Sequence, residues 1–127
     1  MEKKRRLVTT RPLRAWLQTL TPEKASKVTA AMDRVNQAGP TRGRPLVDHV
    51  KGSRHHKMKE LRTGTIRVFF VFERDESLML CGGDKRGARN DWYPRKVGEA
   101  DRLYDQYRRD NGREGPGWRR DPPSHGR

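Results

Sequence analysis

Apolar side chains recur at helical spacing in two successive segments near the N-terminus. Residues 12–20 carry the i, i+3, i+4, i+7 stripe of an amphipathic helix, formed by Leu13, Trp16, Leu17 and Leu20. Residues 21–23 (Thr-Pro-Glu) then predict a second helix, because they supply an N-cap, a proline at the first helical position and an acid near the positive end of the helix dipole. Gly39-Pro40 ends it. We expect two antiparallel helices that serve as scaffold.

The middle of the chain shows the pattern of strands. Residues 57–62, 65–73 and 77–82 are expected to form three strands, joined by turns at Thr63-Gly64 and Asp75-Glu76. The second of these strands is apolar on both faces apart from Arg67. We therefore place it centrally in the sheet and expect helices to cover it on one side.

The two ends of the chain complete the predicted domain. Leu7–Thr9 could form one very short edge strand, and the residues after Pro94 predict a last helix. Residues 1–6 are a basic arm, 7–110 the folded domain, and 111–127, rich in Gly and Pro, a disordered basic tail. Trp118 in that tail could stack on a base or a partner, or be incidental. The predicted fold class is α+β: two N-terminal helices packed on a small antiparallel sheet of three to four strands, with a C-terminal helix.

The chain is strongly basic. Its 127 residues include 30 Lys and Arg against 16 Asp and Glu, for a formal net charge of +14. Such an excess attracts RNA, DNA or an acidic protein, although a basic surface kept for solubility is the alternative. Cys81 is the only cysteine, which excludes a disulfide framework and fits a reducing compartment. No apolar run is long enough to span a membrane, and no signal-peptide core follows residues 1–6. We expect a cytoplasmic protein without a membrane partner.

Cations surround the apolar strand. Lys57 and Lys59 are two residues apart in a predicted strand, so they share a face about 6.6 Å from each other. Arg67 interrupts the apolar run, and burying a lone guanidinium is costly, so it must meet a carboxylate, a phosphate or solvent. An ion pair with Glu60 or Asp84 is the structural alternative to a phosphate.

The residues after the last strand add further candidates. Gly82-Gly83-Asp84-Lys85-Arg86 reads as a loop whose glycines would let the backbone approach a phosphate, although the Gly-Lys-Ser/Thr of a nucleotide-binding P-loop is absent. Either ring of Trp92-Tyr93 could stack on a base, and Tyr93 could also handle a proton, whereas Trp92 reads as core filler. His55-His56 could contact RNA or face solvent; with one Cys and no acid at ligand spacing, no metal site is expected.

This order of residues resembles the RelE/ParE superfamily of type II toxins, and within it the HigB-like, phage-derived branch. The resemblance covers about residues 7–108. It rests on GRPLVDHVKGSRHHKMKELR (43–62), IRVFFVFE (66–73), GGDK (82–85), and WY followed by ADRLYDQY (100–107). The fold it implies is RelE-like. The activity it implies is ribosome-dependent cleavage of mRNA without metal or cofactor, in which the ribose 2′-OH attacks the adjacent phosphate.

The resemblance also implies roles for individual residues. Lys57 and Lys59 match the family's strand lysines, Arg67 its phosphate clamp, Arg86 the arginine after the final strand, and Tyr93 the aromatic that stacks on or deprotonates the nucleotide. Nearby cations could depress the pKa of Lys59, which would let it act as the base. A second set is expected to bind RNA: Arg62, Lys85, Arg89, His55 and His56.

Three functions remain open on this basis. The first is a ribosome-dependent endoribonuclease toxin held inactive by a cognate antitoxin, acidic or of the helix-turn-helix, HigA-like kind, with mRNA and the ribosome as its other partners. The second is a ParE-like poison of DNA gyrase. The third is an RNA-binding or ribosome-associated module whose cations only grip phosphate.

Overall fold

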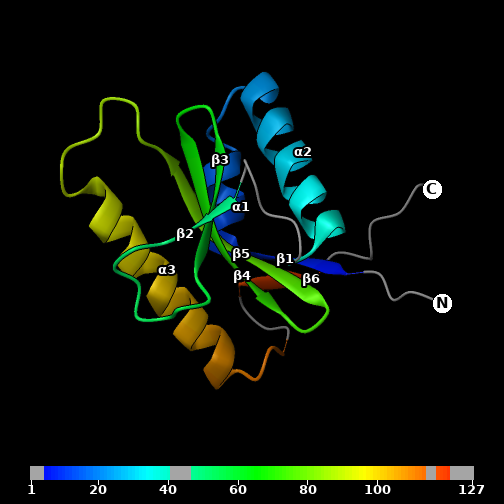
Figure 1. Ribbon diagram of the computed structural model, residues 1–127. Coiled ribbons are helices and arrows are strands. Elements are labelled where there is room, and N and C mark those ends of the chain that lie inside the picture. Colours follow the sequence, from blue (N-terminus) through cyan, green and yellow to red (C-terminus); the bar gives the residue numbers. More distant parts are fainter. Residues whose placement is uncertain (1–4, 41–46, 114–116, 121–127) are drawn as a thin grey trace.

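The computed structural model describes residues 5–40, 47–113 and 117–120, which form three helices and six strands (Figure 1). Residues 1–4, part of the expected basic arm, and 41–46 lie outside the described residues. No helix in the described part is long and apolar enough to cross a bilayer. The elements in chain order are β1 (Arg6–Thr10), α1 (Arg11–Leu17), α2 (Pro22–Ala38), β2 (Val47–His49), β3 (Lys59–Thr63), β4 (Ile66–Glu73), β5 (Glu76–Asp84), α3 (Trp92–Arg109) and β6 (Trp118–Arg120).

The N-terminal helices begin at threonine caps. The Thr10 hydroxyl accepts a hydrogen bond from the Leu13 amide at 3.1 Å, and Thr21 accepts one from Lys24 at 3.2 Å. Gly39, with φ of 75°, follows the last residue of α2 and takes a backbone conformation that costs glycine little. The predicted second helix is thereby confirmed, whereas the first stops at Leu17, short of the expected Leu20.

The sheet is mixed rather than antiparallel. Its strand order is β2-β3-β4-β5-β1-β6, and β1 runs parallel to β5 while every other neighbour is antiparallel. The prediction of a small antiparallel sheet with an edge strand at Leu7–Thr9 was therefore wrong. Leu7 packs into one core and Val8 into the other, so this short strand is apolar on both faces, as an interior strand must be.

The segment expected to be a disordered tail contains β6, which pairs with β1. Trp118 is only 8% exposed and meets Tyr107 edge-to-face, with ring centroids 5.0 Å apart. Its indole N–H donates to Asp110 at 3.0 Å, and Arg120 donates to the Gly112 carbonyl at 2.6 Å and to Glu76. For residues 118–120 the prediction of disorder was wrong, and Trp118 is a core residue rather than an incidental one.

Helices cover both faces of the sheet, not one as expected. One face carries α1 and α2 over a first core built on Leu13, Val28, Met32, Val68 and Phe70. The opposite face carries α3 over a second core, and Figure 1 shows α2 and α3 on either side of the strands. The second core is built on Phe69, Val71, Leu80, Val97 and Tyr104. Successive residues of β4 alternate between these two cores, which explains its nearly uninterrupted apolar sequence.

Gly82 and Gly83 lie within β5 and not in a loop. A Cβ on Gly82 would stand 2.7 Å from Cζ3 of Trp16, and one on Gly83 would stand 2.8 Å from Cζ2 of Trp92. The two indoles thus press on opposite faces of the same strand. The glycines make room for tryptophan, and the predicted phosphate approach at these two positions was wrong.

Replacing Gly82 with Ala is expected to lower the free energy of unfolding by about 1–3 kcal/mol, because the new methyl group would overlap Trp16 and also lie 3.0 Å from the Arg67 carbonyl oxygen. Gly98→Ala in α3 is the matched control. A Cβ there meets only Arg102 at 3.5 Å, so helix propensity should make this variant about 0.5–1 kcal/mol more stable. Urea unfolding measures both changes, and equal stability of the two variants would contradict the packing.

Three tyrosines of α3 fasten the helix to the sheet. The hydroxyls of Tyr93, Tyr104 and Tyr107 donate to carboxylates on three consecutive strands. The acceptors are Glu60 of β3, Glu73 of β4 and Glu76 of β5. Burial and, second, the hydrogen bond to Glu76 raise the pKa of Tyr107 to about 12.

This pairing predicts a loss of stability in alkali. Because the pKa of Tyr107 is higher in the folded state than the ordinary value of about 10, its contribution is complete below pH 10 and falls away as the pH rises toward 12. Tyr107→Phe should therefore show a shallower decline of thermal midpoint between pH 10 and pH 12 than the wild type. Lysines also lose their protons in this pH range, but the wild type and Tyr107→Phe share them, so their effect on the thermal midpoint cancels when the two declines are compared. Parallel declines would contradict this role of Tyr107.

Candidate active site

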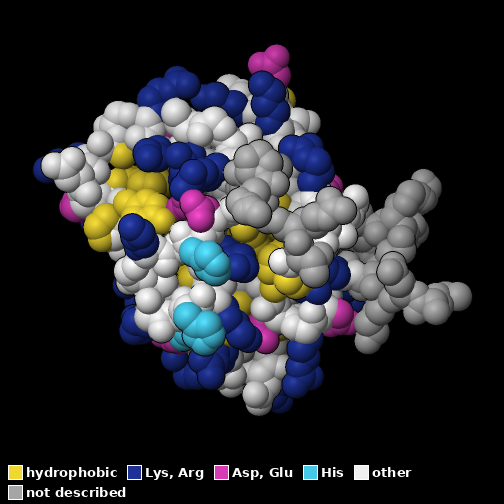
Figure 2. Space-filling model, viewed as in Figure 1, with side chains coloured by type: hydrophobic (Ala, Val, Ile, Leu, Met, Phe, Trp, Pro, Cys, Tyr) yellow, Lys and Arg dark blue, Asp and Glu magenta, His cyan; other side chains and the backbone are white. Residues whose placement is uncertain are grey.

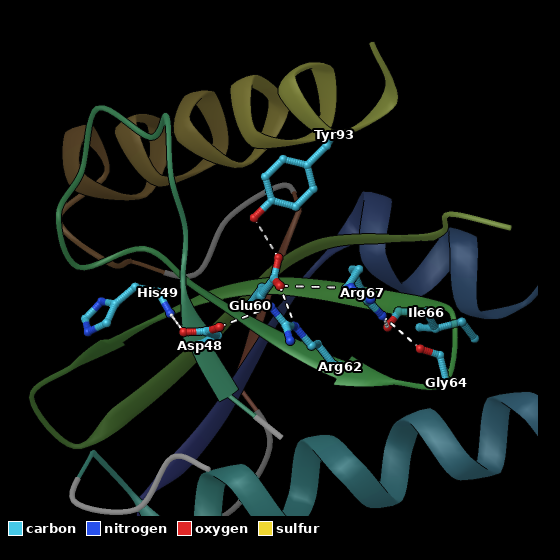
Figure 3. A network of polar contacts seen from close by, with 8 residues as sticks. All are labelled: Asp48, His49, Glu60, Arg62, Gly64, Ile66, Arg67 and Tyr93. Atoms are coloured by element: carbon cyan, nitrogen blue, oxygen red, sulfur yellow. Dashed lines mark hydrogen bonds and ion pairs between the residues drawn. The ribbon is translucent and has the colours of Figure 1, made fainter. Parts of the chain in front are cut away.

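A buried carboxylate lies at the centre of the polar residues on the α3 side of the sheet (Figure 3). Glu60 is 3% exposed, and its Oε1 accepts from the Tyr93 hydroxyl at 2.7 Å. Its Oε2 accepts from Arg62 Nε at 2.7 Å and lies 4.0 Å from Arg67 Nε. We call these four residues the Glu60 cluster: Glu60, Arg62, Arg67 and Tyr93.

Strand register and helix docking bring these four side chains together. In the hairpin of β3 and β4, Arg62 lies directly opposite Arg67, so both leave the sheet on the same face. Glu60 is two residues from Arg62 along β3 and shares that face. Tyr93, in the first turn of α3, rests edge-to-face on Phe69 with centroids 5.6 Å apart and points down at Glu60.

The four residues of the Glu60 cluster carry one net positive charge, because two guanidinium groups face one buried carboxylate. The neighbouring, exposed Asp48 offsets this charge, since the Arg62 guanidinium also reaches it at 3.1 Å. Arg67, 14% exposed, donates to the carbonyls of Gly64 at 2.9 Å and Ile66 at 3.0 Å, which fixes its direction. Arg62 remains 46% exposed and is the part of the cluster most open to an incoming anion.

Tyr93 is a hydrogen-bond donor here and not a base. Burial raises the pKa of the Tyr93 phenol well above its ordinary value, and the hydrogen bond to the Glu60 carboxylate raises it further. The same carboxylate raises the pKa of Arg62. At neutral pH the phenol therefore keeps its proton, so the alternative in which Tyr93 deprotonates the nucleotide is not supported by this geometry, while a stacking role is left open.

Of the five predicted catalytic residues, the structure joins only Arg67 and Tyr93. Lys59 lies directly opposite Phe70, a residue of the first core, so its side chain leaves the sheet on the α1–α2 face, away from the Glu60 cluster. Lys57 pairs with Glu73 at 3.6 Å. Arg86 is exposed beyond β5, where its backbone amide donates to Asp84 at 2.9 Å, and within the described residues its side chain forms no hydrogen bond or ion pair with Glu60.

The predicted RNA-binding residues also separate into groups. Arg62 belongs to the Glu60 cluster. Outside that cluster, three of the predicted residues are exposed on the surface: Lys85, Arg89 and His56. His55 is bound inside the protein: Nε2 lies 2.8 Å from Asp105, and the ring meets Tyr104 edge-to-face at 4.7 Å. Its place indicates a structural role in holding the loop before β3 against α3.

Glu60 is a candidate functional residue that the sequence pattern did not single out. The sequence indicated this glutamate only as an ion-pair partner of Arg67, and that pairing is present. The available signal was the alternation in β3, since Glu60 and Arg62 share a strand face that also carries Arg67 across a two-residue turn. An acid that faces two arginines beside an apolar strand is a candidate for chemistry and not only for pairing.

Two other kinds of chemistry find no support in the described residues. They contain no group of three His, Cys, Asp or Glu side chains placed to hold a metal ion. Burial raises the pKa of the Cys81 thiol to about 12, so this cysteine is a poor nucleophile at neutral pH.

Comparison with known proteins shows the family to which the chain belongs. Residues 15–105 match the family described as phage derived protein Gp49-like (DUF891), which is well over half of the chain. The chain belongs to this Gp49-like family. Homology extends to two proteins of Mycobacterium tuberculosis (strain ATCC 25618 / H37Rv) named "Putative toxin HigB2" and "Putative toxin HigB3".

The share of its length that this chain covers differs between the two relatives. Identity to the HigB2 protein is 39% over 99 residues, 73% of this chain but 49% of that protein, so the chain spans about half its length. Identity to the HigB3 protein is 42% over 95 residues, which is 72% of this chain and 83% of that protein. The predicted family resemblance is thereby confirmed.

A solved structure supports the predicted RelE-like fold. The toxin–antitoxin complex of RelB and RelE from Methanococcus jannaschii matches with a TM-score of 0.51 at 9% identity, over 62% of this chain and 91% of that one. At this identity the likeness concerns the fold alone. Strands β1 and β6 lie outside the segment that matches the Gp49-like family.

Proposed function

We propose that this Gp49-like protein is the toxin of a toxin–antitoxin pair and that it cleaves mRNA on the ribosome. The proposal is supported by homology to two proteins named as toxins and by the RelE-like fold. The observation that carries the chemistry is the Glu60 cluster, in which a buried carboxylate, two guanidinium groups and a protonated phenol share one face of the sheet.

Cleavage proceeds by attack of the ribose 2′-oxygen on the adjacent phosphate, and the cluster supplies the groups that this reaction requires. Glu60 takes the proton of the 2′-OH once the RNA displaces the Tyr93 hydroxyl from Oε1. The 2′-oxygen then forms its bond to phosphorus, the bond to the 5′-oxygen breaks, and that oxygen takes a proton from solvent. Arg62 and Arg67 stabilise the negative charge that builds up on the phosphate oxygens, an interaction stronger in the transition state than in the substrate.

This assignment moves the base from Lys59 to Glu60. Lys59 leaves the sheet on the other face, with Phe70, so it cannot share a phosphate with Arg67 in this structure. A carboxylate also needs no depressed pKa to accept a proton at neutral pH. Lys57, Lys85, Arg86 and Arg89 contribute instead to the general attraction of RNA, which their exposure and charge allow.

The positive charge of the protein indicates what kind of antitoxin would inhibit it. A protein of net charge +14 binds acidic surfaces, and an antitoxin that places carboxylates over Arg62 would compete with RNA for the cluster. A small gene next to this one that encodes a helix-turn-helix protein would support such a pair.

Induced expression with transcript-end mapping tests the function. The wild type should arrest growth and cut messages within coding regions, and Arg67→Ala should do neither. Arg95→Ala is the matched control, because Arg95 is an exposed α3 arginine that forms a surface ion pair with Asp91, four residues earlier, at 3.4 Å, and it should behave as the wild type. A DNA-damage response with intact transcripts would indicate a gyrase poison, and absence of arrest an RNA-binding module. Either result would overturn the proposal.

A further inference from the structure

Trp92 lies outside both hydrophobic cores, although its indole packs against the β5 backbone at Gly83. Trp118 belongs to the second core and Trp16 packs against the first, whereas the residues grouped in or packed against either core do not include Trp92. Its indole is partly exposed at the start of α3 and presses on the backbone of Gly83. The prediction that Trp92 is core filler packing the last helix is thus met in part: the indole packs α3 on β5, and part of the side chain stays open to solvent.

The position of Trp92 relates it to the Glu60 cluster. Gly83 is the strand partner of Arg67, so the indole that packs on Gly83 lies on the face of the sheet from which Arg67 leaves, one strand over from it. The ring of Tyr93 follows, with its centroid 6.5 Å from that of Trp92. Figure 2 shows hydrophobic side chains open to solvent and bordered by Lys and Arg where β5 ends and α3 begins.

Basic residues also lie on the loop that leads into Trp92. Lys85, Arg86 and Arg89 are all exposed in the loop between β5 and α3, directly before Trp92. An aromatic face set between an arginine cluster and a basic loop is the arrangement by which proteins bind single-stranded nucleic acid: cations follow the phosphates while the ring receives a base. A core tryptophan would not need this charge pattern around it.

We propose that Trp92 is a stacking platform for a base of single-stranded RNA, next to the nucleotide whose phosphate the Glu60 cluster holds. This inference rests on the proposed function, because it takes RNA as the ligand of that cluster. Trp92 contributes affinity and positions the strand, and it takes no part in proton transfer. Because every base has a flat apolar face, the platform tolerates many sequences, and it holds purines, which stack most strongly, better than pyrimidines.

Single-tryptophan proteins test the stacking directly. One variant keeps Trp92 and carries Trp16→Phe and Trp118→Phe, and its counterpart keeps Trp16 and carries Trp92→Phe and Trp118→Phe. Each is titrated at low salt with a 2′-O-methyl oligoribonucleotide, which cannot be cleaved at its 2′ positions. A matched strand of equal length with abasic sites supplies the same phosphates without bases. Trp16 is the fitting control because it presses on the adjacent glycine from the opposite face.

The expected result is quenching of Trp92 fluorescence by the base-bearing strand, with little quenching by the abasic strand and none of Trp16 by either. Trp92→Leu, which keeps an apolar side chain but loses the ring, should weaken binding by about tenfold with an unchanged salt dependence. Equal quenching by both strands, equal quenching of Trp16, or undiminished affinity of Trp92→Leu would each overturn the inference.

Failure of the stacking can be told apart from failure of the proposed function. Transcript cuts by the wild type together with an unquenched Trp92 would refute only the platform. Quenching of Trp92 in a protein that leaves transcripts intact would refute the ribonuclease and keep RNA as the ligand. Thermal unfolding of Trp92→Leu serves as the check that a loss of affinity does not reflect a loss of fold.

Discussion

Glu60→Gln is expected to slow mRNA cleavage by about 10²–10⁴-fold, the usual contribution of a general base. Glutamine has the same shape and its carbonyl oxygen can still accept the Tyr93 hydroxyl, but it cannot take a proton from the ribose 2′-OH. The effect should appear in the rate of the chemical step, with RNA affinity equal to or above that of the wild type, since a negative charge has been removed beside the bound phosphate.

Glu99→Gln is the control for this substitution. Glu99 lies on α3, is about one-third exposed and pairs with Lys96 at 3.2 Å, so its replacement removes a surface ion pair and should leave cleavage unchanged. Rates are compared on purified ribosomes that carry a defined message, with thermal unfolding to confirm that both variants are folded. A Glu60→Gln protein that cuts at the wild-type rate would remove the carboxylate from the mechanism.

Trp118→Ala is expected to lower the free energy of unfolding by about 3 kcal/mol. The substitution empties a buried site beside Tyr107 and removes the indole donor to Asp110, and truncation of a buried tryptophan typically costs about 3–5 kcal/mol. The strand is short and lies at the sheet edge, so partial relaxation places the expected value at the lower end of that range.

Arg119→Ala is the matched control on the same strand. Arg119 is exposed and next to Trp118, so its loss should change stability by less than about 0.5 kcal/mol. Urea unfolding monitored by circular dichroism measures both variants. A Trp118→Ala protein as stable as Arg119→Ala would mean that β6 does not dock on β1, and that this part of the C-terminal segment behaves as the disordered tail that its composition predicts.

Local signals explain which elements the sequence predicts. The helix at 22–38 has a cap, a dipole-matched acid and a terminal glycine, and the three central strands have apolar runs separated by turns, so each of these can be found within a short window. The position of β1 cannot be found in this way, because Arg6 pairs with Glu76 far along the chain. The strand β6 is hidden in the sequence by surrounding glycines and prolines, and it becomes visible only through tertiary contacts, which are its pairing with β1 and the packing of Trp118 on Tyr107.

The candidate site shows a different kind of error. Arg67 and Tyr93 do come together at Glu60, but Lys59, expected beside them, lies on the opposite face of the sheet. A two-residue hairpin always places odd-numbered residues of one strand opposite even-numbered residues of the next, so Lys59 and Arg67 had to diverge once the turn was accepted. Glu60 had to join Arg67 by the same reasoning. Strand parity was therefore available from the sequence, whereas the approach of Tyr93 from α3 required the tertiary structure.

The most direct test of the central claim uses a message with a single 2′-deoxynucleotide. Purified protein is mixed with ribosomes translating an mRNA whose cleavage position has been mapped, and the nucleotide 5′ to that bond is replaced by its 2′-deoxy form. If the Glu60 cluster activates the ribose hydroxyl, the unmodified message yields a 2′,3′-cyclic phosphate end and the modified message is not cut at that bond. Cutting of the modified message at the same bond, or an intact unmodified message, would contradict the account.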